Sequence, residues 1–226
     1  MNLKNKVIVI TGGSKGLGKE LARFLVLEKA KVIISARSKN ELLKASQETG
    51  ALTCLCDVSK ENEVNKLAAF ALKKFGKIDI WINNAGITIP HMDVEDINPK
   101  SAHEVMEINF FGTFYGSRAA LKIMKKQKGG TILNIVSMSS LIGRAQSSVY
   151  AASKWAARGF TESLRIALEP YNISVLMVHP GGFKTTIFGK FKPAGYKTWM
   201  EIDYVAKKII QNLKKKSPKK EIIVNK

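Results

Sequence analysis

Short apolar runs rich in valine and isoleucine alternate with longer amphipathic stretches along the chain. The apolar runs predict strands at residues 7–11, 32–35, 51–56, 78–82, 131–136 and 174–178, with a short last strand at 221–224. The amphipathic stretches predict helices at residues 16–28, 40–47, 61–75, 102–126, 149–169 and 204–214. Because the strands are apolar throughout and alternate with helices, the pattern predicts an α/β fold with a parallel sheet covered by helices on both faces.

The bulk composition is typical of a globular protein. The chain has 226 residues, and neither an internal repeat nor a low-complexity linker divides it, so we expect a single domain over residues 1–226. No apolar run approaches the roughly 18 residues that span a bilayer, and the N-terminal residues do not resemble a signal peptide. Cys54 and Cys56 stand two apart in one predicted strand, which suits core packing better than a disulfide or a metal site. We therefore expect a cytoplasmic protein.

Charge is the unusual bulk feature. Lysine and arginine number 37 and aspartate and glutamate 18, which gives a formal net charge of +19. The lysines are spread along the chain, and their densest cluster, at residues 214–220, falls where a helix is expected to end and where cations suit the helix dipole. We interpret the charge as a solvated lysine-rich surface. Contact with an anionic membrane or another polyanion is the alternative, and nucleic acid is the less expected of these partners.

A glycine-rich turn joins the first predicted strand to the first helix. It runs Thr11-Gly12-Gly13-Ser14-Lys15-Gly16-Leu17-Gly18, with Gly-x3-Gly-x-Gly spacing. Glycines allow a tight turn and the close approach of a phosphate, and the helix N-terminus offers free N–H groups to a pyrophosphate. Ligands of open parallel sheets bind beyond the carboxyl ends of the strands. The turn therefore predicts a dinucleotide site, although turns also use glycine for purely structural reasons.

The second predicted strand ends beside a basic residue. An NAD site usually has Asp or Glu about 20 residues after the glycines, to hold the ribose 2′-hydroxyl. This chain has Arg37 there instead, and Lys15 within the glycine turn. Two cations suit a 2′-phosphate, so the pattern favours NADP(H) as cofactor. The alternative is that both are ordinary surface cations.

Small polar residues follow the next two strands. The Asp57 carboxylate could accept a hydrogen bond from an adenine amine or cap the next turn. After the fourth strand, Asn83-Asn84-Ala85-Gly86 combines small residues that permit close approach of a cofactor with amides that can tie strand ends together.

Tyr150 and Lys154 stand four residues apart in a predicted helix, and therefore on one face of it. A free tyrosine titrates near pH 10, but an ammonium about 5 Å away is worth roughly 3 kcal/mol to the phenolate, or about two pKa units. Such a tyrosine can exchange a proton with a carbonyl or alcohol oxygen. Ser137, at the end of the fifth strand, could hydrogen-bond to the same oxygen. The Tyr-x3-Lys pair is a weak signal alone and gains weight from the glycine turn.

Together these motifs closely resemble those of the classical short-chain dehydrogenase/reductase family, over nearly the whole chain. The resemblance rests on Thr11-Gly12-x3-Gly16-x-Gly18, Asn83-Asn84-Ala85-Gly86, Asn109, Ser137, Tyr150-x3-Lys154 and Pro180-Gly181-x3-Thr185. It implies a Rossmann-like, doubly wound fold, a nicotinamide cofactor and hydride transfer to or from a carbonyl carbon.

The resemblance also implies roles for individual residues. Tyr150 would be the general acid/base, and Lys154 would lower its pKa and bind the nicotinamide ribose. Ser137, chosen over the neighbouring serines because it lies 13 residues before Tyr150, would orient the substrate carbonyl. Asn109 would hold a water in the proton relay, unless it is a helix-interior amide that bonds only to backbone. The residues expected to contact the cofactor are Gly12, Ser14, Lys15, Gly16, Leu17, Gly18, Arg37, Ser38, Asp57, Val58, Asn84, Ala85, Gly86, Tyr150, Lys154, Pro180, Gly181, Phe183 and Thr185.

The loop at residues 186–200 is expected to cover the substrate. Four aromatic residues suggest an apolar lid, although they could instead anchor the loop on the core or at a subunit interface. They are Phe188, Phe191, Tyr196 and Trp199, and the lysines between them, which could accept an anionic group, are Lys190, Lys192 and Lys197. Family members commonly continue a few dozen residues past the last strand, whereas this chain stops at Lys226. The resemblance also implies a homodimer or homotetramer through the helices at 102–126 and 149–169.

The leading hypothesis is an NADPH-dependent reductase of ketones or aldehydes that also acts in reverse on alcohols. A non-catalytic nucleotide-sensing or polyanion-binding module is the alternative. The histidines have no partner at the spacing of a metal site or a catalytic triad, so no metal is predicted and His91, His103 and His179 are left out of the site.

Overall fold

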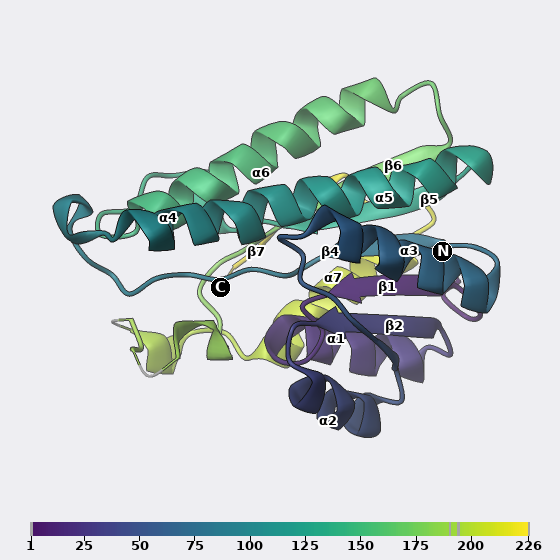
Figure 1. The fold of residues 1–226 in the computed structure, drawn as a ribbon, viewed down its shortest axis with the longest axis horizontal. Coiled ribbons are helices and arrows are strands. Elements are labelled where there is room, and N and C mark those ends of the chain that lie inside the picture. The colour runs from purple at the N-terminus through teal and green to yellow at the C-terminus, as the bar shows by residue number, and fades with distance from the viewer. Residues whose placement is uncertain (1, 190, 194, 226) are drawn as a thin grey trace.

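A parallel sheet forms the centre of the computed structural model, which describes residues 2–189, 191–193 and 195–225. Seven strands pair in the order β3-β2-β1-β4-β5-β6-β7 (Figure 1). They are β1 (Val7–Thr11), β2 (Lys31–Ala36), β3 (Leu52–Leu55), β4 (Ile80–Asn83), β5 (Gly130–Ile135), β6 (Ile173–Pro180) and β7 (Glu221–Val224). Every neighbouring pair is parallel. The predicted doubly wound, Rossmann-like sheet is confirmed.

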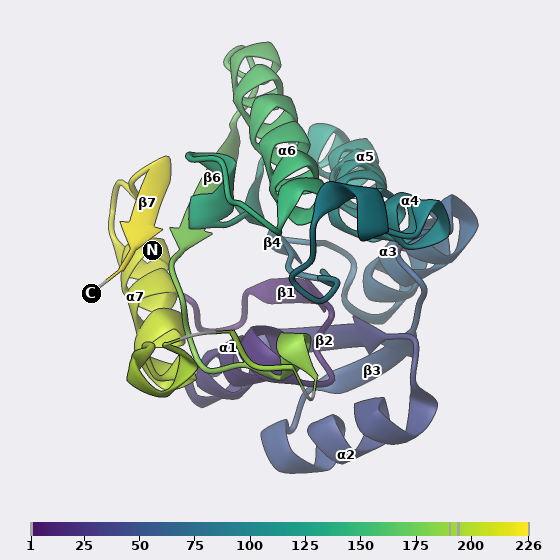
Figure 2. The same cartoon turned by 90° about the vertical axis from the view of Figure 1, so that its left-hand side faces the viewer.

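Helices cover both faces of the sheet (Figures 1 and 2). One face carries α1 (Gly16–Leu27), α2 (Lys39–Thr49) and α7 (Ile202–Lys214). The other carries α3 (Glu61–Phe75), α5 (Gly112–Lys126) and α6 (Ser148–Ala167), with α4 (Pro99–Met106) beside α6. None of the helices in the described part of the chain is long and apolar enough to cross a membrane.

The central strands are apolar on both sides because each side has its own core. Within β1, Ile8 and Ile10 pack in the core beneath α1 and α7, whereas Val9 packs in the core beneath α3 and α5. This follows from the alternation of side chains along a strand. Cys54 and Cys56 both pack at the second core. The lysine cluster begins where α7 ends, at Lys214, as expected.

The predicted helix at residues 102–126 differs in the structure. Helix α4 begins earlier, at Pro99, because the Asn98 side chain accepts a hydrogen bond from the Lys100 N–H and proline suits a first helical turn. A π-helical turn, Glu107–Phe111, then separates α4 from α5. Such π-turns are often found at functional sites, and this one contains Asn109.

The strands after β1 are added to the sheet first on one side of it, as β2 and β3, and then on the other side, from β4 onward. Strands β1 and β4 therefore lie side by side although β2 and β3 come between them in sequence. The loops after these strands diverge and leave a crevice at the carboxyl edge of the sheet. All the predicted functional motifs follow strands on this edge, apart from Asn109 and the Tyr150–Lys154 pair, which helices carry.

Candidate active site

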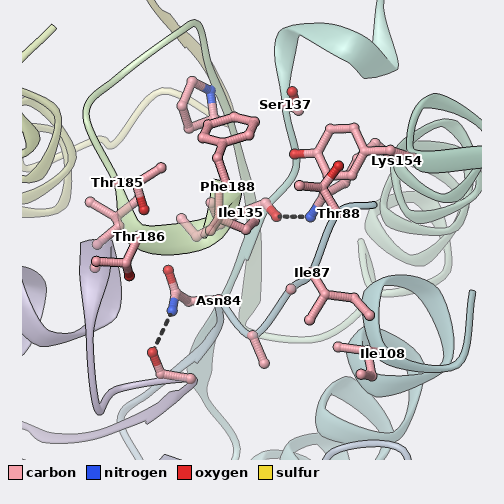
Figure 3. Close-up of a pocket in the computed structure, with 18 of the residues that line it drawn as sticks. Asn84, Ile87, Thr88, Ile108, Ile135, Ser137, Lys154, Thr185, Thr186 and Phe188 are labelled. Carbon is pink, nitrogen blue, oxygen red and sulfur yellow. Dashed lines mark hydrogen bonds between the residues drawn. The ribbon is translucent and has the colours of Figure 1, made fainter. Parts of the chain in front are cut away.

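A cleft of about 800 Å³ lies at the carboxyl edge of the sheet, lined by residues of the loops after β1 to β6. Figure 3 shows Ser137, Thr88 and Lys154 along one wall and Thr185, Thr186 and Phe188 along the other. The predicted site residues all line this cleft except Gly18 and Asn109. The structure thus brings together predicted site residues that are up to 173 positions apart in sequence, from Gly12 to Thr185.

Close packing explains the glycines of the turn after β1. Gly12 and Gly16 have φ of 66° and 57°, in the left-handed region that favours glycine. A Cβ at Gly12 would lie 2.7 Å from the Ala85 Cα, and one at Gly18 would lie 2.3 Å from the Gly12 carbonyl oxygen. Gly18 therefore supports the turn from below and does not face the cleft.

The turn leaves the start of α1 open to an anion. Its N-cap, Lys15, makes no side-chain hydrogen bond to the first-turn N–H groups. Gly16 lines the cleft, and a Cβ there would point at the Thr185 hydroxyl, 3.2 Å away. Free N–H groups, a positive dipole end and the missing side chain together fit a pyrophosphate.

The two cations expected at a 2′-phosphate both line the same end of the cleft, and each has an acidic neighbour. Lys15 Nζ lies 3.6 Å from a carboxylate oxygen of Glu41, and Arg37 lies 3.5 Å from one of Glu104. All four side chains are about half exposed. Exposed pairs of this kind contribute only about 0–1 kcal/mol, so both cations remain able to exchange their partner for a phosphate.

Asp57 and Asn84 serve the structure of the strand ends. The Asp57 carboxylate accepts hydrogen bonds from the N–H and hydroxyl of Ser59, at 3.0 and 2.8 Å, and so caps the next turn. The Asn84 amide donates to the carbonyls of Thr11 and Gly12 and ties β4 to the glycine turn. Both still line the cleft, so the capping role leaves contact with a cofactor possible.

Tyr150 and Lys154 come together near the start of α6. The ammonium of Lys154 lies 5.8 Å from the centroid of the Tyr150 ring. Lys154 is 4% exposed, and it donates a hydrogen bond of 3.2 Å to the Ile135 carbonyl at the end of β5 (Figure 3). This contact fixes the ammonium against the sheet edge beside the tyrosine.

The pKa of Tyr150 differs in direction from the sequence-based expectation. Burial raises it, and the hydrogen bond with the Ser137 hydroxyl opposes the rise. Burial also lowers the pKa of Lys154 to about 8. The expectation counted the attraction of the ammonium for a phenolate but not the loss of hydration of both charges, and here desolvation is the larger effect.

Ser137 stands at the start of a 3₁₀ turn, Met138–Ser140, where its hydroxyl accepts a hydrogen bond from the Ser139 N–H. Ser137 and Ser139 both line the cleft, whereas Ser140 is buried and donates to the Ser137 carbonyl. His179 lies behind the turn. Its Nδ1 lies 2.8 Å from Ser140 Oγ and 3.2 Å from the Ser137 carbonyl oxygen, and its Nε2 lies 2.7 Å from Glu221 on β7. A buried histidine therefore links the edge strand to the turn that carries Ser137.

Asn109 is fully buried and does not line the cleft. Its amide nitrogen donates to the Ile87 carbonyl and to the Ser153 hydroxyl, and its oxygen accepts from the Ile87 N–H. Two of these three bonds are to the Ile87 backbone, as the backbone-bonding alternative expects, and the third is to a side chain. They hold the loop after β4 against the π-turn.

The loop after β6 covers the cleft with part of its aromatic set. Phe188 and Trp199 line the cleft, with ring centroids 5.4 Å apart, and Tyr196 packs on both. Phe191 points away and is 72% exposed. Lys190 lies outside the described residues.

Several cleft residues were missed from the sequence because they carry no motif. Glu41 on α2 approaches Lys15 from a helix that no motif marks. Thr88 and His91 follow the Asn-Asn-Ala-Gly motif, and Arg144 lies between Ser137 and Tyr150. For Thr88, His91 and Arg144, the position after β4 or β5 is the sequence signal that could have indicated them.

Comparison with known proteins agrees with this architecture. A family model described as short chain dehydrogenase matches residues 6–194. An uncharacterized oxidoreductase of Staphylococcus saprophyticus is 37% identical over 191 residues, covering 82% of this chain and 77% of the relative. The trans-4-hydroxycyclohexanecarboxylate dehydrogenase of Sinomonas cyclohexanicum is 35% identical over 198 residues, covering 83% of this chain and 76% of the relative.

Two solved structures resemble the chain over 98% of its length and 97% of their own. An alcohol dehydrogenase from the archaeon Thermococcus sibiricus, complexed with 5-hydroxy-NADP, has a TM-score of 0.87 at 28% identity. A 3-ketoacyl-(acyl-carrier-protein) reductase from Brucella melitensis, complexed with NADH, has a TM-score of 0.91 at 27% identity.

Proposed function

Since the chain belongs to the short-chain dehydrogenase/reductase family of oxidoreductases, we propose that it is an NADPH-dependent reductase of a ketone or aldehyde. In reverse it would oxidise the corresponding alcohol. The observation that carries the proposal is the meeting of Tyr150, Lys154 and Ser137 in one cleft whose other end is the glycine turn. We further propose that the chain is one NAD(P)-binding domain in which residues 186–200 act as the substrate lid.

The nicotinamide cofactor would supply or accept the hydride. Its pyrophosphate would bind at the open start of α1, against Gly12, Gly16 and Leu17, and Gly86 and Thr185 would flank the nicotinamide end. The fit at Gly86 is close, because a Cβ there would lie 3.2 Å from Asn109 Oδ1 and 3.5 Å from Lys154 Nζ. Thus Gly86 leaves Lys154 accessible to the ribose hydroxyls.

Proton transfer would run through Tyr150. In the direction of reduction, the carbonyl carbon gains a hydride and the Tyr150 hydroxyl donates its proton to the carbonyl oxygen. The Ser137 hydroxyl would hold that oxygen in place, and protonated Lys154 would stabilise the phenolate that forms. Asn109 would act indirectly, by holding the Ile87 loop and the π-turn in position.

Preference for NADP(H) rests on Arg37 and Lys15. An arginine can bind the 2′-phosphate through two charge-assisted hydrogen bonds, and no carboxylate follows β2 directly to bind a 2′-hydroxyl in its place. The acidic neighbours Glu41 and Glu104 are exposed and weakly bound. A phosphate would therefore displace them at little cost.

The substrate would be a small carbonyl compound with an apolar body, packed against Phe188 and Trp199. The similar proteins with defined names are a trans-4-hydroxycyclohexanecarboxylate dehydrogenase, an alcohol dehydrogenase and a 3-ketoacyl-(acyl-carrier-protein) reductase. These names support a carbonyl or secondary-alcohol substrate.

We also propose a homodimer or homotetramer through α5 and α6. On this side, the rings of Phe110, Phe111, Phe114, Tyr115 and Phe160 pack in a chain of edge and tilted contacts. Trp155 and Ile166 on α6 are 47% and 68% exposed, and apolar side chains of this size suit a subunit interface. A monomer in light scattering would contradict this part of the proposal.

The test is NADPH oxidation, followed by absorbance, with a panel of cyclic, aromatic and linear ketones. We expect turnover with at least one class of ketone and its loss in Tyr150→Phe, while Tyr150→Phe still binds NADPH. Absence of turnover across the panel, combined with salt-dependent binding of a polyanion, would favour the non-catalytic alternative.

A further inference from the structure

Arg144 lines the substrate side of the cleft, on the loop that joins the two catalytic residues Ser137 and Tyr150. We propose that Arg144 binds a carboxylate on the substrate, so that the enzyme prefers a ketone or alcohol with an apolar body and an anionic group. This inference rests on the proposed reductase function and specifies its substrate class.

The cations that line the cleft differ in whether they have a partner. Lys15 and Arg37, at the nucleotide end, each have a carboxylate within ion-pair distance. Lys154 is fixed by the Ile135 carbonyl. The Arg144 side chain has no hydrogen-bond or ion-pair partner within the described ranges 2–189, 191–193 and 195–225. Its five N–H donors are therefore available to a ligand.

The sign of the charge at the substrate end of the cleft also favours an anion. Among the described lining residues the only carboxylates are Glu41 and Asp57, which follow β2 and β3 at the nucleotide end. The residues around the substrate end are apolar or neutral, apart from Arg144 and His91. Arg144 is exposed, so its guanidinium can meet an incoming anion, and a charge-assisted hydrogen bond is stronger than a neutral one.

Hydrogen bonds of the backbone around Arg144 hold this residue in a defined place. Its carbonyl accepts a hydrogen bond from the Ser147 N–H, which closes a tight turn, and Gln146 within that turn has φ of 56°. The Gln146 carbonyl accepts a hydrogen bond from the Met92 N–H, and the Gln146 side-chain amide donates one to the Asp93 carboxylate. The loop after β5 is thereby tied to the loop after β4, and His91 lines the same part of the cleft as a second possible donor.

Apolar side chains on the cleft walls indicate that the rest of the substrate is apolar. Ile187, Phe188 and Trp199 line the cleft on the lid, and Met138 and Ala145 line it near the catalytic serine. These surfaces suit a ring or short chain between the carbonyl at Tyr150 and a carboxylate at Arg144. Bidentate binding of a carboxylate is the geometry that arginine favours.

The experiment compares 3- and 4-acetylbenzoate with their methyl esters, which keep the ketone and the ring but carry no charge. In wild-type enzyme we expect kcat/KM for at least one acid to exceed that for its ester. Arg144→Gln should lower the acid-to-ester ratio about 10- to 100-fold, mainly through KM, because a hydrogen bond to a charged group is lost. Arg144→Lys should retain part of the ratio, since the charge remains without the bidentate geometry.

The matched control is Arg118→Gln, which removes an arginine on α5 that pairs with Glu61 and does not line the cleft. It should keep the wild-type ratio. An unchanged ratio in Arg144→Gln would overturn the inference. If no ketone is turned over, the proposed function fails separately, and calorimetric titration of the enzyme–NADP complex with the acids decides the inference. A weaker acid affinity in Arg144→Gln supports it, and an equal affinity overturns it.

Discussion

Arg37→Asp should convert the proposed NADPH preference into a preference for NADH. The substitution removes the guanidinium expected at the 2′-phosphate and supplies the carboxylate that NAD sites usually place there. Arg37 is about half exposed, and among the residues that the structure describes it forms an ion pair with Glu104 alone, at 3.5 Å, so little structural stability depends on it.

The magnitude follows from the charges involved. The exposed pair with Glu104 contributes about 0–1 kcal/mol, whereas hydrogen bonds to a charged group contribute about 1.5–3 kcal/mol each. Loss of the phosphate contact should therefore lower kcat/KM for NADPH about 10- to 100-fold, at 1.4 kcal/mol for each factor of ten. A new hydrogen bond from the ribose hydroxyl to Asp should raise kcat/KM for NADH about 10-fold. The NADPH-to-NADH ratio should thus fall about 100- to 1000-fold.

Steady-state kinetics with both cofactors and one ketone provide the assay. Lys66→Asp is the matched control, because Lys66 is exposed on α3, does not line the cleft and changes the charge by the same amount. At physiological ionic strength a charge outside the cleft is largely screened. If Arg37→Asp keeps the NADPH preference, or if Lys66→Asp shifts it equally, the assignment of Arg37 is wrong.

Two further predictions concern groups buried around the site. Burial lowers the pKa of Lys154 to about 8 in the folded protein, whereas a lysine in the unfolded chain titrates near 10.4. At a pH between these two pKa values, the unfolded state therefore binds more protons than the folded state. The unfolding free energy should then rise by about 3 kcal/mol between pH 8 and the unfolded pKa, relative to Lys154→Met. Denaturant titrations at several pH values in this range measure the unfolding free energy of both proteins. The same pH dependence in wild type and Lys154→Met would refute the prediction. His179→Phe should lower the unfolding free energy by about 1–3 kcal/mol, since Ser140 and the Ser137 carbonyl lose a buried partner. It should also lower kcat while NADPH affinity stays within about twofold, and an unchanged kcat would exclude a positioning role.

Most of the fold could be predicted from the sequence because hydrophobic periodicity is local information. The strands appear within two residues of their predicted bounds at every end, and helix α3 spans Glu61–Phe75 as predicted. The interruption before α5 could not be predicted from periodicity. It depends on the Asn109 amide bonding to the Ile87 backbone, which is 22 residues away in the sequence.

The residues of the cleft could be predicted where they come directly after a strand. Arg37, Asp57 and Ser137 each stand just after a strand, and the structure collects them along one edge. Electrostatics were less predictable, because the pKa of Tyr150 depends on burial, which sequence spacing does not reveal. Glu41 and Glu104 could not be expected beside the two nucleotide-end cations, because only the packing of α2 and α4 in the folded chain brings them there.

The central claim is that the cleft between the glycine turn and Tyr150 transfers a hydride from NADPH to a carbonyl carbon. The most direct measurement incubates the enzyme with NADPH deuterated at its transferable position and a ketone that is turned over, and then analyses the alcohol by mass spectrometry. Wild-type enzyme should yield alcohol with one deuterium on the carbinol carbon, and Tyr150→Phe should yield at least about 100-fold less, in keeping with the loss of a general acid. Alcohol without deuterium, or equal deuterium transfer by Tyr150→Phe, would contradict the account.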